Sequence, residues 1–394
     1  MYLATDVLAL ADIIEEFRRV MREVTGLDLL HSLTLPKASW LGFLRKSAVK
    51  IELVCDEELH QAVEDGIRGG VCVPYQSHAV ANDPRAEHDA ERPDSIIGYW
   101  DANSLYPWAM MMPLALRNYR QLFEDLEQTV RSRCEHFVED TPTGLYIDAT
   151  IRVPVELHDE LDLAPARKGP IGKTEKLYPY LGEQRLHLHL PLLAAYTRQG
   201  VEIVAVHRVW EYDQERYMRS TLEDLAARRA AADSESLKTA CKLASCALYG
   251  MCILNKAKWK SWALYTDAER WECDVANNHA PGLRAWCPLN EEGAFLGYRE
   301  RRMVKGVCLD SPRLQGGHIL DWSKYRMWTF HYECMRKICR PLLLYQDTDS
   351  FIYLIENCRD PHELMCRAPE WFDFKTGKAL GWRENANSSQ PGYF

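Results

Sequence analysis

A short apolar ribbon with two closely spaced acids constrains the fold more than any other segment of this chain. Residues 342–355 read LLLYQDTDSFIYLI. Only Thr348 separates Asp347 from Asp349, and strand-forming apolar residues flank the acids on both sides. This pattern predicts a β-hairpin that carries both carboxylates at its tip.

Two acids on an apolar hairpin are unfavourable unless a positive charge compensates them. Hard divalent cations bind carboxylate oxygens, and Mg²⁺ commonly uses one or two protein carboxylates together with substrate phosphates. A pair of Mg²⁺ ions bound to a nucleoside triphosphate is therefore the leading candidate, with Mn²⁺ as the alternative ion. Taken alone, the two acids are ordinary for a solvated turn, which is the alternative interpretation.

Composition limits what else the chain can be. Its 394 residues are 47% hydrophobic and 27% charged, which is enough for a core and for two to three domains. The net charge of −9 means that a polyanion must be held by local basic groups or by metal ions. Thirteen scattered cysteines indicate an intracellular reducing compartment (nucleus, cytoplasm or mitochondrion). No apolar run approaches the ~20 residues of a membrane span, so we expect no membrane partner.

A second acid and a helix pair precede the hairpin. Residues 95–100 read as a strand, and Asp101 ends it. The patterns at 215–232 and 237–248 are helical, and the short polar turn between them predicts an antiparallel pair. Residues 156–180, which are rich in proline and glycine, are predicted to form a loop.

The helix pair carries basic residues that can face one polyanion. Lys238 and Lys242 lie four residues apart and share a helical face, and Arg229 lies near the end of the preceding helix. A solvated helix face is the simpler interpretation of these residues. In the order strand-end acid, basic helix and acidic hairpin, however, they fit a two-metal phosphoryl-transfer site.

These segments resemble the motifs of family B DNA polymerases, most closely the protein-primed branch of viruses, linear plasmids and self-replicating DNA transposons. Residues 101–107 (DANSLYP) match motif A, D-x-x-S-L-Y-P, and residues 345–350 (YQDTDS) match motif C, Y-x-D-T-D-S. Residues 242–250 follow motif B, K-x-x-x-N-S-x-Y-G, except that Cys246 and Ala247 replace its asparagine and serine. Each hydrogen bond lost there is worth ~1 kcal/mol.

The resemblance extends upstream of motif A. Tyr2 and Asp6 resemble Y-x-x-x-D, the third exonuclease motif, here a vestige without the two earlier motifs; an ordinary helix start is the alternative. Residues 67–70 (IRGG) resemble the glycine-pair linker between exonuclease and polymerase modules, or form a simple turn. After motif C, we expect the thumb to be truncated.

The resemblance implies an α+β fold: a right-hand polymerase palm, with an antiparallel sheet and packed helices, plus an antiparallel helix-pair fingers subdomain. The implied domains are, in order, the end of an exonuclease-like domain with its linker (1–66), the palm with an insertion between motifs A and B (67–213), the fingers helix pair (214–250), the palm with a second insertion and the catalytic hairpin (251–358), and a truncated thumb or tail (359–394).

The resemblance also assigns roles to single residues. Asp101 and Asp349 are the implied ligands of both metal ions, with Asp347 as the third, supporting catalytic acid. The implied nucleotide-binding residues are Ser104, Leu105, Tyr106, Arg229, Lys238, Lys242 and Tyr249. Among them, Tyr106 would stack beneath the incoming sugar and exclude a 2′-hydroxyl, and Tyr249 would shape the base-pair pocket.

The implied activity is that of a DNA-directed DNA polymerase in the replication of a virus or mobile element. A primer 3′-hydroxyl on a DNA primer-template attacks the α-phosphate of a dNTP, and a terminal priming protein is an optional partner. The alternative is a catalytically impaired fragment that only binds nucleotide or DNA, as Cys246, Ala247 and the truncated thumb suggest. Tyr106 and the D-T-D sequence argue against an RNA polymerase or reverse transcriptase.

Overall fold

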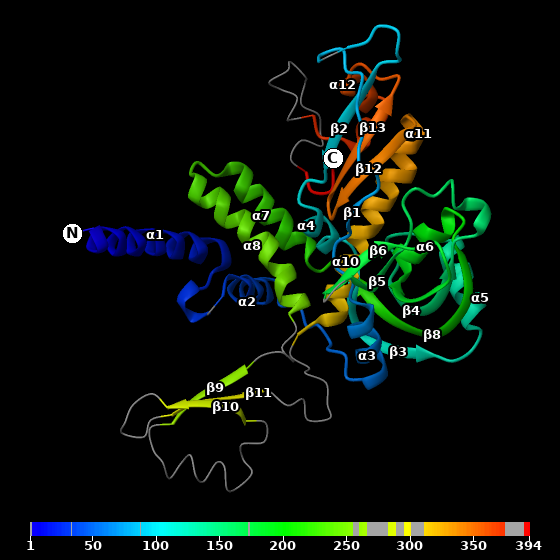
Figure 1. Ribbon diagram of the computed structural model, residues 1–394. Coiled ribbons are helices and arrows are strands. Elements are labelled where there is room, and N and C mark those ends of the chain that lie inside the picture. Colours follow the sequence, from blue (N-terminus) through cyan, green and yellow to red (C-terminus); the bar gives the residue numbers. More distant parts are fainter. Residues whose placement is uncertain are drawn as a thin grey trace.

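The computed structural model (Figure 1) places a central sheet between a helical region and a second sheet. The structure describes residues 2–32, 34–86, 88–171, 174–254, 260–265, 283–288, 295–300, 311–374 and 390–394. None of the helices within these ranges is long and apolar enough to span a bilayer.

The central sheet, called here the hairpin sheet, has the order β1-β12-β13-β2 and is antiparallel throughout. Its strands are β1 (Cys72–Pro74), β12 (Pro341–Asp347), β13 (Ser350–Glu356) and β2 (Ser95–Asp101). The predicted hairpin and the predicted strand before Asp101 are thus both confirmed, and the two are neighbours. Alternation along β13 buries Phe351, Tyr353 and Ile355 on one face.

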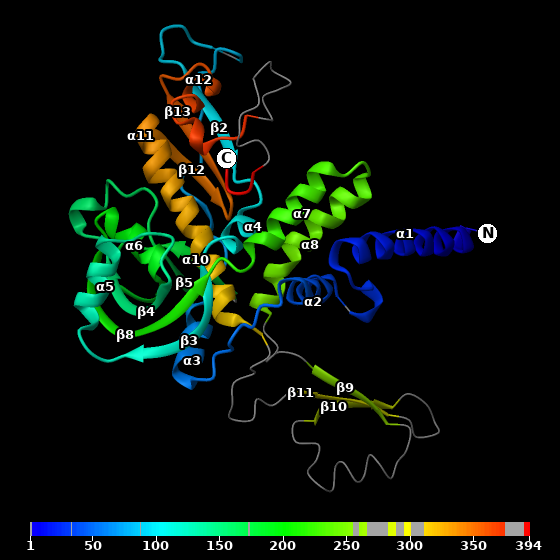
Figure 2. The same cartoon turned by 180° about the vertical axis from the view of Figure 1, so that it is seen from behind.

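A long helical segment covers that buried face. Helix α10 (Arg313–Thr329) continues through a π-helical turn (Phe330–Met335) into α11 (Arg336–Ile338). Phe330 in the π-turn is fully buried, and its ring lies parallel to that of Phe351 with 6.4 Å between centroids. The rear view (Figure 2) shows the same segment running along the hairpin sheet and on to the second sheet.

The second sheet, called here the insertion sheet, lies between motifs A and B in the sequence. Its order is β3-β8-β4-β7, again antiparallel. The strands and their helices are β3 (Leu114–Leu122), α5 (Leu126–Glu135), β4 (Thr143–Arg152), β7 (Gln184–His189), α6 (Leu190–Arg198) and β8 (Glu202–Glu215). The loop predicted over 156–180 is wrong in part, because β5 (Ala166–Ile171) and β6 (Thr174–Pro179) pair there as a ribbon despite their prolines and glycines.

The predicted helix pair is present as α7 (Arg219–Ala231) and α8 (Glu235–Ile253). The Ser234 hydroxyl accepts a hydrogen bond from the amide of Leu237, so it caps α8 and ends the polar turn. Helices α1 (Tyr2–Thr25) and α2 (Leu35–Ser47) pack beside α8. The remaining elements are η1 (Leu29–His31), α3 (Glu57–Gly66), α4 (Leu105–Met110), η2 (Val155–Leu157), β9 (Lys260–Tyr265), β10 (Leu283–Pro288), β11 (Phe295–Glu300), α12 (Pro361–Met365) and η5 (Pro369–Trp371).

Burial on the hairpin sheet predicts a clear difference between two truncations. Phe351→Ala removes a fully buried ring between β13 and the π-turn and should destabilise the protein by about 3–5 kcal/mol. Ile97→Ala, on the exposed face of β2, should change stability by less than ~0.5 kcal/mol. Urea unfolding followed by circular dichroism measures both, and equal losses would contradict the assigned faces of the sheet.

Candidate active site

Three acids meet at one end of the hairpin sheet because of its strand register. Ser350, the first residue of β13, pairs with Asp347 on one side and with Asp101 on the other. Residues in one such row lie on the same face of a sheet, and adjacent strands are only ~4.8 Å apart. Asp349 directly precedes Ser350, and its carbonyl accepts a 2.7 Å hydrogen bond from the amide of Ala102. Motifs A and C are therefore joined by backbone hydrogen bonds.

The hairpin tip is sharply turned. Thr348 has φ +51°, in the left-handed region that a β-branched residue rarely adopts. The amide of Asp349 reaches the carbonyl of Asp347 at 2.5 Å, and the amide of Thr348 donates to the carbonyl of Val71 at 2.8 Å. A β-branched residue keeps this conformation only when the surrounding structure holds it there.

The carboxylates at this end repel one another. Partial burial raises the pKa of Asp349, and the negative charges of Asp101 and Asp347 raise it further. The Tyr99 hydroxyl donates to a carboxylate oxygen of Asp101 at 2.9 Å. Within the described residues, no group of three or more His, Cys, Asp or Glu side chains is placed so that it could hold a metal ion. The oxygen donors fit a hard cation whose remaining ligands come from a substrate.

The turn after Asp101 leads directly into a short helix. Ser104 has φ +48° and precedes α4, and its carbonyl accepts a hydrogen bond from the amide of Trp108 at 3.0 Å. Leu105 is buried and anchors the first turn of α4, so it faces the core. Tyr106 lies on the same short helix and is only partly buried.

Two tyrosines connect this turn to the helix pair. The rings of Tyr106 on α4 and Tyr249 on α8 are stacked, with centroids 4.5 Å apart and an interplanar angle of 7°. Burial raises the pKa of Tyr106, and the charge of Asp349 raises it further, so this ring lies within electrostatic reach of the acids. The structure thus brings together Tyr106, Tyr249 and the acidic tip.

The basic residues of the helix pair occupy different environments. Lys242 and Arg229 are exposed, and the charges of both act to lower the pKa of the Cys246 thiol, which desolvation raises. They therefore lie near the motif B position where cysteine replaces asparagine. Lys238 instead forms a 2.9 Å ion pair with Glu235, one turn earlier.

Tyr2 and Asp6 are not brought to this site. Both lie at the start of α1, which points away from the hairpin sheet in both views (Figures 1 and 2). The Asp6 side chain is exposed, and the Tyr2 side chain lies outside the described residues.

A contact that sequence reasoning missed holds the turn after Asp101. The amide of Asn103 donates to the carbonyl of Tyr393 at 2.8 Å, and the amide of Gly392 donates to the carbonyl of Asn103 at 2.6 Å. Phe394 stacks on Phe330 with centroids 3.5 Å apart. The only sequence signal was the aromatic pair after Gly392, which motif comparison does not use.

Arg326 also binds this segment, residues 392–394, which is called the tail from here on. Its Nε donates to the Gly392 carbonyl at 2.7 Å, and its guanidinium lies 4.4 Å from the centre of the Trp371 ring. A side chain at Gly392 would collide with the ring of Trp108, so the tail lies directly on α4.

The family of the chain follows from comparison with known proteins. Residues 1–269, more than half of the chain, match the model of DNA polymerase type B, organellar and viral. The chain therefore belongs to this family. A comparison with curated protein sequences gave no match.

Solved structures of Phi29 DNA polymerase share the fold. The complex with primer-template DNA and incoming nucleotide substrates is 17% identical, with TM-score 0.50, over 84% of this chain and 50% of that chain. The post-translocation binary complex with primer-template DNA is 16% identical, with TM-score 0.52, over 91% of this chain and 53% of that one. This chain thus spans about half the length of these polymerases. The fold is the expected α+β polymerase fold, with an antiparallel palm sheet and a fingers helix pair.

Carboxylate repulsion at the tip predicts that Asp349→Asn stabilises the metal-free protein at neutral pH. The pKa of Asp349 is higher in the folded state than in the unfolded state. Ionisation of this carboxyl therefore lowers the free energy of unfolding as the pH rises from the unfolded-state pKa to the folded-state pKa. The gain in Tm of the variant should therefore be largest near pH 7 and disappear as pH falls toward 3.8, the ordinary pKa of aspartate. Calorimetry in a chelator measures it, and a destabilised variant at pH 7 would contradict the repulsion.

The tail contacts predict a local change in hydrogen exchange. Phe394→Ala removes the stack on Phe330 and should accelerate exchange of the Asn103 and Gly392 amides by about tenfold or more. The amide of Ala102, which is bound to Asp349 instead, is the internal control and should keep its rate. Exchange followed by NMR or mass spectrometry distinguishes these amides, and an unchanged Asn103 rate would contradict the role of the tail.

Proposed function

We propose that this chain is a DNA-directed DNA polymerase that adds dNTPs to a primer 3′-hydroxyl. One observation carries the proposal: strand register gathers Asp101, Asp347 and Asp349 at one end of the palm sheet, while the stacked Tyr106 and Tyr249 join them to the fingers helix pair. An acidic site that is connected through two stacked tyrosines to a basic helix pair fits a nucleoside triphosphate with its metal ions.

The donor set fits Mg²⁺, with Mn²⁺ as the alternative. Asp101 and Asp349 would hold both ions, and Asp347 would support them; the raised pKa of Asp349 indicates a place where positive charge is favoured. When bound, two such ions stabilise the attacking and leaving oxygens of an in-line displacement. The protein groups then have to fix the carboxylates and orient the substrate.

The nucleotide would lie between the turn after Asp101 and the fingers. Ser104, in its left-handed conformation, turns the chain so that the amides of Leu105 and Tyr106 begin a helix, where phosphates bind favourably. Lys242 and Arg229 are free to reach the phosphates, since the described ion pairs involve neither, whereas Lys238 must first leave Glu235. Tyr106 would exclude a 2′-hydroxyl, and Tyr249 would help to shape the base-pair pocket.

The substrate and partners are proposed by analogy with the solved relatives. Phi29 DNA polymerase was solved with primer-template DNA and with incoming nucleotides. We propose the same classes of ligand here, in the replication of a virus or mobile element. A terminal protein that supplies the priming hydroxyl is a further proposed partner.

A second candidate function is binding of nucleotide or DNA without extension. It is favoured by Cys246 and Ala247, which replace the asparagine and serine of motif B. Cys246 is exposed beside Lys242, where an asparagine would offer a stronger hydrogen bond to a ligand.

Primer extension with Mg²⁺ and dNTPs tests the proposal. Asp349→Ala and Asp101→Asn should each reduce the rate of extension by about 10²–10³-fold or more, because each removes a ligand at the reacting phosphate. Glu356→Gln, at the opposite end of β13, is the matched control and should retain the rate. All variants should have their folding checked by circular dichroism.

The outcomes separate the two functions. Extension that survives Asp349→Ala would contradict the metal-ligand assignment. A wild-type chain that binds labelled primer-template and dNTP but adds no nucleotide, with either Mg²⁺ or Mn²⁺, would favour the second candidate.

A further inference from the structure

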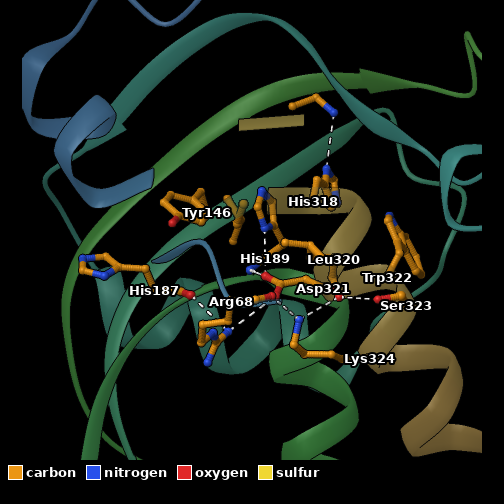
Figure 3. Close-up of polar contacts among 12 residues, drawn as sticks. Arg68, Tyr146, His187, His189, His318, Leu320, Asp321, Trp322, Ser323 and Lys324 are labelled. Atoms are coloured by element: carbon orange, nitrogen blue, oxygen red, sulfur yellow. Dashed lines mark hydrogen bonds and ion pairs between the residues drawn. The ribbon is translucent and has the colours of Figure 1, made fainter. Parts of the chain in front are cut away.

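A buried polar cluster lies outside the acidic site, where α10 crosses the insertion sheet (Figure 3). Arg68, His189, His318 and Asp321 are each at most 3% exposed. Burying charges costs several kcal/mol per ion unless each finds partners. The buried charges of this cluster must therefore be compensated by specific hydrogen-bond and ion-pair partners.

Asp321 on α10 is the centre of this cluster. It accepts hydrogen bonds from both the backbone amide and Nδ1 of His189, each at 2.9 Å, and an ion pair from Arg68 at 3.4 Å. The imidazole of His189 stacks on that of His318 with centroids 4.1 Å apart. Burial lowers the pKa of His189, and that of His318 more strongly, which favours neutral rings. A single carboxylate thus fixes one cation and one neutral histidine.

Both ends of Arg68 are fixed. Its guanidinium donates to the carbonyls of Ala166 at 3.4 Å and His187 at 3.3 Å, in addition to Asp321. Its own backbone carbonyl accepts a 2.6 Å hydrogen bond from Nζ of Lys324, which also donates to the carbonyl of Leu320 at 3.1 Å. Lys324 is half-buried, and desolvation lowers its pKa to about 7, although Asp321 opposes the change.

The residues after Arg68 run directly beneath the acidic tip. A Cβ atom added to Gly70 would lie 2.2 Å from Oγ1 of Thr348, so the linker backbone touches the tip. The next carbonyl, that of Val71, accepts the Thr348 amide at 2.8 Å, and Cys72 then pairs with Asp347 in β1. Lys324 and Thr348 line the same small cavity, of about 30 Å³, together with Gly70 and Val71 of the linker.

We propose that Lys324 and Arg68 are positioning residues for the metal-binding acids. Together they hold the linker, here residues 67–71, against α10, and the linker in turn holds Thr348 in its left-handed conformation between Asp347 and Asp349. This inference rests on the proposed function of those acids. It adds two residues, on the linker and on α10, to the groups that determine metal affinity.

The test compares the Mg²⁺ concentration that gives half-maximal primer extension at saturating dNTP. Lys324→Met should raise this concentration by about 10–100-fold, the usual effect of losing a group that orients metal ligands. Lys324→Arg keeps a donor to the Arg68 carbonyl and should recover most of the loss. Mn²⁺ binding followed by electron paramagnetic resonance gives a readout that does not require extension.

The matched control is Arg133→Met on α5. Arg133 also donates to a main-chain carbonyl, that of Thr143 at 2.7 Å, but it lies on the insertion sheet and away from the linker. This variant should lose thermal stability comparably and still leave the Mg²⁺ midpoint within about twofold of wild type. An equal shift in both variants would reduce the role of Lys324 to general stability and overturn the proposal.

A second route to the tip covers the case in which Lys324→Met does not fold. Gly70→Ala introduces a methyl group against Thr348 and should weaken Mn²⁺ binding, and Thr348→Gly in the same chain should restore it because it removes the collision and suits φ +51°. Undiminished binding in Gly70→Ala would contradict the proposal.

The outcomes distinguish this inference from the proposed function. A wild-type chain that extends primers, with Lys324→Met at the same Mg²⁺ midpoint, overturns only the positioning role. A wild-type chain without Asp349-dependent Mn²⁺ binding overturns the metal site and this inference together. Wild-type Mn²⁺ binding that Lys324→Met weakens supports the inference even if no extension is seen.

Discussion

The pairing of β13 with both β12 and β2 is the constraint on which the rest of this structure depends. It places Asp101, from a strand near residue 100, in one row with Ser350 and Asp347, some 250 positions later in the chain. Long-range antiparallel pairing of this kind is specific because a slip of one residue would turn every side chain to the other face. The buried faces of Phe351, Tyr353 and Ile355 against the π-helical turn prevent that slip.

The acidic end is held against its own repulsion by backbone contacts from three directions. The Asp349 carbonyl accepts a hydrogen bond from motif A, and the Thr348 amide donates one to the linker. The tail binds both the backbone amide and the backbone carbonyl of Asn103. Each of these contacts uses main-chain atoms and therefore occupies no carboxylate oxygen of the acids. Positive φ at Ser104 and Thr348 shows that the two loops are held in unfavourable conformations by their surroundings.

Much of the architecture was predictable because it has a short-range signal. Alternating apolar residues identify the hairpin, and helical periodicity with a polar turn identifies α7 and α8. The prolines and glycines of 156–180 misled the prediction, since β5 and β6 form an isolated ribbon that tolerates Pro170 and Gly169. The buried cluster around Asp321 had no signal either, because its members come from the linker, β7 and α10 and meet only when α10 packs across the insertion sheet.

The sequence by itself determined the family and the chemical types present: three acids in two motifs, two tyrosines and a basic helix. Those features depend on residue identity and spacing along the chain. Only the tertiary structure decided which groups meet. It stacked Tyr106 on Tyr249, tied Lys238 to Glu235, and set Gly70 beneath Thr348. The reason is physical: these contacts arise from the packing of segments that are distant in sequence, and packing is set by the shapes of many side chains together.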